Sequence, residues 1–82
     1  MNGNNARTWT FDDCTVIEDE SNFCFEIHME RDGQIRTQIV NPANNDDMAA
    51  CIADLDAGLS PVGAWEDGVG NLVCWESAED GE

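Results

Sequence analysis

Apart from the many carboxylates, four cysteines and one histidine are the residues of this chain that could act as a nucleophile, a general base or a metal ligand. Structural zinc sites usually take their ligands in close pairs such as Cys-x-x-Cys, because one turn must offer two sulfurs to one tetrahedral ion. The cysteines here are separated by 9, 26 and 22 intervening residues, so the sequence contains no such pair. We expect no metal, and we interpret the reduced thiols as small core residues. The cysteines are Cys14, Cys24, Cys51 and Cys74.

His28 lies two residues after Cys24 on one face of a predicted strand, roughly 6.5–7 Å away between α-carbons, so a thiol–imidazole pair is within reach. The same strand face offers neither the oxyanion donor nor the substrate pocket that such a nucleophile needs. We therefore interpret His28 as an exposed histidine between Glu26 and Glu30. Cys14 and Cys24 fall on adjacent predicted strands, and a disulfide between them remains open.

Carboxylates are so frequent in this chain that no pair of them indicates a hydrolase. No acidic run matches the spaced Asp-x-Asp-x-Asp-Gly loop that calcium prefers. Gly68 and Gly70 belong to a predicted hairpin turn with no helix after it, unlike a phosphate-binding loop. We predict no catalytic residue, no cofactor and no enzymatic activity. The alternative, a small enzyme or metal protein, would need metal in the purified sample or a buried His28.

The net charge is the dominant feature of the composition. Eighteen acidic residues face three arginines, with no lysine, for a formal charge of −15. Solubility needs a magnitude of only about 2–8 in a small domain, and a higher charge weakens the compact state by self-repulsion. Direct binding to nucleic acid or to an anionic membrane is excluded, because both require Lys and Arg. A basic protein surface remains as the expected partner.

Apolar alternation predicts several strands, and one segment has the helical period. We expect an α+β fold in which an antiparallel sheet of about five strands, in the order βββαββ, carries one helix on one face. Residues 1–82 should form a single domain that frays at about 1–6 and 77–82. Trp65 and Trp75 are predicted to lie in the core. The predicted strands are 7–17, with a bulge near Asp12 and Asp13, then 23–30, 34–40, 62–66 and 72–76.

The turn between the second and third strands sets which side chains share a face. A two-residue Asp32-Gly33 loop would place Met29 opposite Arg36 and so mix apolar and charged residues. A three-residue loop places Met29 opposite Ile35 and His28 opposite Arg36. We predict the longer loop.

The predicted helix runs from about Asp46 to Ala57, with Asn44 or Asn45 as its N-cap and Gly58 as its C-terminal cap. Its buried stripe is Met48, Cys51, Ile52 and Leu55. The opposite face is a stripe of small residues that could pack against a partner or form a homodimer. This stripe is Ala50, Ala53 and Ala57.

Acidic residues gather at loops and on polar strand faces, where they could imitate a row of phosphates before an arginine- and lysine-lined groove. The predicted partner-binding residues are Glu18, Asp19, Glu20, Glu26, Glu30, Asp46, Asp47 and Asp54. A further acidic pair, Glu66 and Asp67, lies in the late turn.

The N-terminus has neither a basic cluster nor an apolar stretch, so we expect a cytoplasmic protein.

In size, charge and the pattern of Phe23 to Glu30 followed by Asp46 to Ala57, the chain resembles the small acidic proteins with which phages and mobile elements block host defences. These include anti-CRISPR proteins and DNA mimics. The resemblance implies non-enzymatic inhibition in the host cytoplasm, by occupation of a basic, nucleic-acid-binding surface of a defence effector. The alternatives are an antitoxin or immunity protein that caps a basic toxin nuclease, and a housekeeping domain of a salt-adapted organism.

Overall fold

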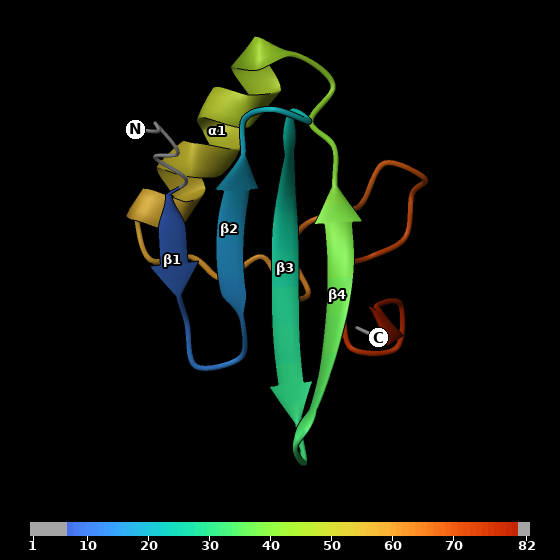
Figure 1. Cartoon of the computed structure of the whole chain (residues 1–82). Coiled ribbons are helices and arrows are strands. Elements are labelled where there is room, and N and C mark those ends of the chain that lie inside the picture. The colour runs from blue at the N-terminus through green and yellow to red at the C-terminus, as the bar shows by residue number, and fades with distance from the viewer. Residues whose placement is uncertain (1–6, 81–82) are drawn as a thin grey trace.

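The computed structural model describes residues 7–80, which form one antiparallel sheet and one helix (Figure 1). The sheet has the order β1-β2-β3-β4-β5, so neighbours in sequence are neighbours in space. The predicted α+β class is confirmed. The frayed ends expected at 1–6 and 81–82 lie outside the described residues. The elements are β1 Thr8–Thr10, β2 Thr15–Asp19, β3 Cys24–Arg31, β4 Gln34–Val40, α1 Asn45–Asp56 and β5 Glu79–Asp80.

The first predicted strand is in fact a hairpin. Asp12 and Asp13 form the turn between β1 and β2, which is closed by the Phe11 amide donating to the Cys14 carbonyl at 2.8 Å. The pairing Trp9↔Val16 then brings two apolar residues together on one face. The expected bulge is wrong because two successive aspartates favour a turn over a continued strand.

The turn between β3 and β4 has two residues, and the predicted three-residue loop is wrong. Asp32 and Gly33 have φ values of 54° and 80°, which suit a type I′ turn whose twist matches the flanking strands. Met29 therefore lies opposite Arg36, and His28 lies opposite Thr37. The charged Arg36 is accommodated on the covered face because its guanidinium stacks on Trp75, 4.5 Å from the ring centroid.

Helix α1 begins and ends within one residue of the predicted bounds. Asn44 is its N-cap and accepts a hydrogen bond from the Asp47 amide at 2.9 Å. At the other end Gly58 has φ 88°, and the amides of Gly58 and Leu59 donate to the carbonyls of Leu55 and Asp54. This is a Schellman motif. The predicted stripe is confirmed: Met48 and Leu55 are buried and the two residues between them are half-buried.

One face of the sheet is covered and the other is open. Helix α1 lies behind the sheet in Figure 1, and the segment 57–78 runs behind the sheet and then beside β4; both pack on the covered face. Phe25 and Ile27 have no solvent exposure there, and the half-buried Trp65 stacks edge-on against Phe25 at 5.5 Å. Within residues 7–80 no helix is long and apolar enough to cross a membrane.

The segment after the helix is a chain of turns, so the strands predicted at 62–66 and 72–76 are wrong. A single bridge, Glu66–Leu72, is all that remains of the expected hairpin. A positive φ angle at Gly63 interrupts the first apolar run, and the amides of Ser77 and Ala78 donate to the Cys74 carbonyl, which turns the chain within the second. Residues 77–80, expected in a frayed tail, instead form a turn and β5, which pairs with β4 through Thr37↔Glu79.

Candidate partner-binding surface

The side of the sheet that faces away from α1 is the open sheet face. Strand alternation places Ile17, Glu26 and Ile39 in one row across it, because these residues are cross-strand partners. Ile35 and Ile39 are 52% and 41% exposed. Carboxylates on this face are thus interleaved with apolar side chains. We define the open sheet face by Thr10, Thr15, Ile17, Asp19, Glu26, His28, Glu30, Ile35, Thr37 and Ile39.

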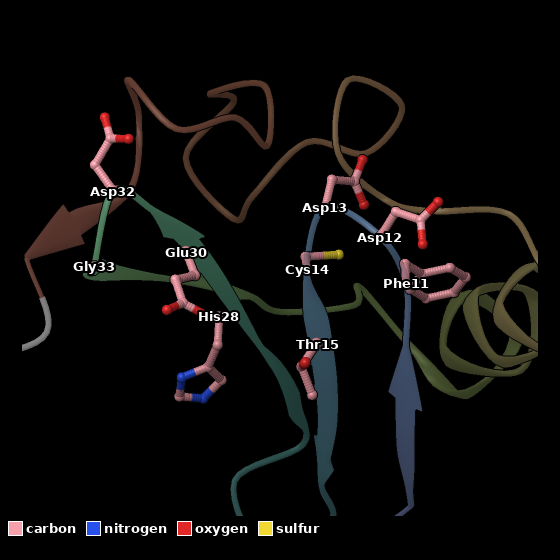
Figure 2. Close-up of a pocket in the computed structure, with 9 residues that line it drawn as sticks. All are labelled: Phe11, Asp12, Asp13, Cys14, Thr15, His28, Glu30, Asp32 and Gly33. Carbon is pink, nitrogen blue, oxygen red and sulfur yellow. The ribbon is translucent and has the colours of Figure 1, made fainter.

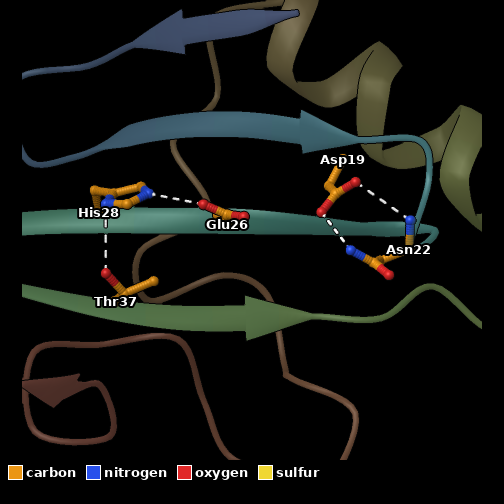
Figure 3. A network of polar contacts seen from close by, with 5 residues as sticks. All are labelled: Asp19, Asn22, Glu26, His28 and Thr37. Carbon is orange, nitrogen blue, oxygen red and sulfur yellow. Dashed lines mark hydrogen bonds and ion pairs between the residues drawn. The ribbon is translucent and has the colours of Figure 1, made fainter. Parts of the chain in front are cut away.

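His28 is held at the middle of this face by two side chains (Figure 3). Its Nε2 lies 3.2 Å from Glu26 Oε1, and its Nδ1 lies 3.3 Å from Thr37 Oγ1. A carboxylate only accepts, so the neutral ring carries its proton on Nε2 and accepts from Thr37 on Nδ1. The ring is half-buried, between the exposed state that we predicted and the buried state that an enzyme would favour.

Acidic residues surround a pocket at the end of the sheet where both tight turns lie (Figure 2). The pocket has a volume of about 340 Å³. The β1–β2 turn contributes Asp12 and Asp13, strand β3 contributes Glu30, and the β3–β4 turn contributes Asp32. Of these four, only Glu30 was among the predicted partner-binding residues. The other three were missed because their proximity depends on both hairpins, although Asp12 and Asp13 did signal a break in the strand.

The opposite end of the face carries Asp19 and Glu20. Asp19 accepts hydrogen bonds from the Asn22 amide at 3.2 Å and from the Asn22 side chain at 2.8 Å (Figure 3). These bonds lower the pKa of Asp19, so its charge is retained at neutral pH. Glu20 is exposed in the adjoining turn.

The remaining predicted site residues lie elsewhere. Asp46, Asp47 and Asp54 are exposed on α1, behind the sheet and away from the open face. Glu18 is buried on the covered face at 3% exposure, so the expectation that it lies on a polar face is wrong. The reason is register, since Glu18 pairs with the buried Phe25 and points the same way.

The three arginines are all engaged within the molecule. Arg7 forms an ion pair with Glu18, with Nε 3.4 Å from Oε1. Arg31 and Arg36 stack on the Trp75 ring at 4.9 and 4.5 Å, and Arg36 Nη1 also donates to the Trp75 carbonyl at 3.0 Å. None of these guanidinium groups lies on the open sheet face, so they do not neutralise its carboxylates.

Thiol chemistry is disfavoured at three of the four cysteines. Burial raises the pKa of Cys14 to about 11, and it also raises the pKa of Cys24 and Cys51. Thiols with raised pKa values are protonated at neutral pH and are poor nucleophiles. Cys14 immediately precedes the first residue of β2, whereas Cys24 lies opposite Asp19, the last residue of β2. The two cysteines are therefore at opposite ends of the β2–β3 pair, and this distance excludes the disulfide that the sequence left open.

No group of metal-ligating side chains is gathered closely enough to hold a metal ion in the part of the chain that the structure describes. Comparison with known proteins adds no relative: no family model, no curated protein and no solved structure matches this chain. The surface must therefore be interpreted from its own chemistry.

Proposed function

We propose that this protein acts without catalysis, by laying its open sheet face on a basic surface with which another protein binds nucleic acid. The observation that carries the proposal is the separation of charge: the arginines make intramolecular contacts away from the open face, while carboxylates occupy both ends and the middle of that face. A partner of opposite charge would be attracted over a long range and oriented on approach.

The carboxylates of the open face are arranged along strand β3. Strand β3 has eight residues and so spans about 25 Å. Glu26 and Glu30 project from it on one side. Asp32 follows its C-terminal end, and Asp19 lies on the neighbouring strand β2, opposite its first residue. Glu26 and Glu30 are four residues apart and so stand about 13 Å from each other, which is wider than the charge repeat of about 3.4 Å along one nucleic-acid strand. The face therefore supports mimicry by the sign and the row-like arrangement of its charges rather than by their spacing.

The exposed isoleucines support a protein partner rather than loosely held counterions. Ile35 and Ile39 present apolar area between the carboxylates. Burial of such area stabilises a complex by about 25 cal/mol per Å², a contribution that salt does not screen. We therefore infer a stoichiometric complex in which charge guides association and the isoleucines slow dissociation. An anti-defence inhibitor fits this description, with a basic nucleic-acid-binding effector as its target.

The test is a pull-down from host lysate with the immobilised protein at low salt, with the bound proteins identified by mass spectrometry. We expect recovery of one basic, nucleic-acid-binding protein that is released by high salt and by its own nucleic acid. The identity of that protein, a defence effector or a toxin nuclease, decides between an inhibitor and an immunity protein. Recovery of a protein that its nucleic acid does not displace would contradict mimicry.

A further inference from the structure

A groove on the helix side of the molecule forms a second acidic surface, separate from the open sheet face. It runs between α1, the segment that follows β4 and the turn around Glu66, and it has a volume of about 440 Å³. Its floor includes Pro42, Cys51 and Trp65, and its rim carries Asp47 and Asp54. We propose that this groove binds an arginine side chain in an extended basic peptide segment of a partner protein.

The combination of an aromatic floor and an acidic rim selects the occupant. Trp65 is half-buried, and its edge-on contact with Phe25 at 5.5 Å and 61° holds the ring in place. A guanidinium stacks on an aromatic ring while its N–H groups still reach carboxylates at the margin. Asp54 and Glu66 approach the groove from its two sides and are both exposed.

The size and lining of the groove favour a peptide over a bare cation. A volume of about 440 Å³ is that of a small-molecule site rather than of a single ion. The aliphatic stem of arginine can lie along Pro42 and Cys51 while its charged head reaches the rim. Lysine carries the same charge but lacks the planar group that stacks, so the groove should prefer arginine.

The probe is the blocked pentapeptide Gly-Arg-Gly-Arg-Gly, titrated into the ¹⁵N-labelled full chain at low salt, with the matched Gly-Lys-Gly-Lys-Gly peptide for comparison. We expect saturable shifts of the Trp65 indole N–H and of the Cys51 and Gly68 amides, with tighter binding of the arginine peptide. Removing one rim charge, by Asp54→Asn or Glu66→Gln, should raise the Kd about two- to fivefold.

Asp46→Asn is the matched control, since it makes the same charge change on the same helix outside the groove. It should change the Kd less than Asp54→Asn does. A second pair fills space instead of changing charge: Ala50→Phe should block the groove, while Ala53→Phe should not, because only Ala50 lines it.

Equal effects of Asp46→Asn and Asp54→Asn would overturn the proposal, since they would show binding to net charge alone. Shifts confined to the open sheet face would also overturn it. The variants of the groove and those of the sheet face share no residue, so failure here leaves the proposed function of the open face standing, and the reverse is equally true.

Discussion

At the scale of single residues, Glu18 is a buried carboxylate that forms an ion pair with Arg7, one of the three arginines of the chain. Its side chain is 4% exposed and Oε1 has no hydrogen-bond partner within residues 7–80, so its charge is compensated by the ion pair with Arg7. Arg7 itself is 55% exposed, and solvent screens the pair in part. A buried carboxylate with one screened partner is a source of instability that the surrounding fold must offset.

Substitutions at this pair should behave asymmetrically. Arg7→Ala should lower the free energy of unfolding by about 1–2 kcal/mol, because it leaves a buried charge uncompensated. Glu18→Met should be neutral or stabilising, since a methionine of similar shape removes the need for compensation. Urea unfolding of both variants measures these changes.

The double variant is the control for this prediction. In a Glu18→Met background, Arg7→Ala should hardly change the free energy of unfolding, because the carboxylate that would otherwise lose its ion-pair partner is absent. An equal cost of Arg7→Ala in both backgrounds would mean that Arg7 acts through packing rather than through Glu18.

Cys14 should make the free energy of unfolding depend on pH. Its pKa rises from 9.0 to about 11 on folding, mainly through burial, so the native state holds the thiol proton more tightly than the unfolded chain. The contribution of this thiol to stability is fully present below pH 9 and is lost as the pH rises toward 11.

We therefore expect the wild-type free energy of unfolding to fall over this range by on the order of 2 kcal/mol on account of this residue. Cys14→Ala should have a smaller decline, measured by urea unfolding at several alkaline pH values. Parallel pH profiles for the two proteins would contradict the assignment to Cys14.

At the scale of elements, Gln38 connects the sheet to the irregular segment after the helix. It is 4% exposed on β4, and its Oε1 accepts from the Cys74 amide at 3.2 Å while its Nε2 donates to Asp67 at 3.0 Å. Asp67 also accepts from the amides of Val69 and Asn71, so one glutamine fixes the turn and the chain beyond it.

Gln38→Ala should lower the free energy of unfolding by about 2 kcal/mol, because it leaves the Cys74 amide without its acceptor. Gln34→Ala, at an exposed position of the same strand, should cost little and serves as the control. Chemical denaturation measures both. Equal costs would show that the loss comes from strand propensity rather than from the hydrogen bonds.

The elements differ in how far the sequence predicts them. The helix was predictable to within one residue at each end, because Asn44 and Gly58 cap it through local chemistry. The segment 62–76 was not, since its apolar residues pack by tertiary contact and its course is fixed by Gln38, which is remote in sequence. The prediction of the β3–β4 register was wrong for a related reason. The two-residue loop places Arg36 on the covered face, and the stacking on Trp75 that stabilises it there is a long-range contact.

At the scale of the whole molecule, the charge of −15 opposes folding through self-repulsion. We expect the chain to be folded at low salt. Its melting temperature should rise when the NaCl concentration is increased from about 20 mM to about 300 mM, because counterions screen the carboxylates. A thermal melt followed by circular dichroism tests this. A chain that folds only at high salt would instead indicate a domain of a salt-adapted organism.

The sequence predicts the charge of the candidate surface but not its location. Glu26 and Glu30 follow from strand alternation, and they do lie on the open face. Asp19 was expected in a turn, and it lies on this face because β2 continues as far as this residue. Asp12, Asp13 and Asp32 join Glu30 only because two separate turns end at the same edge of the sheet, which composition cannot reveal.

The most direct test of the proposed function compares two double charge reversals against the partner recovered by pull-down. Glu26→Lys with Glu30→Lys changes the open sheet face, and Asp46→Lys with Glu76→Lys makes the same change in net charge away from it. We predict that the first variant loses binding to the basic partner while the second keeps most of it, with both folded by circular dichroism. Equal loss in the two variants, or full binding by the first, would contradict the account.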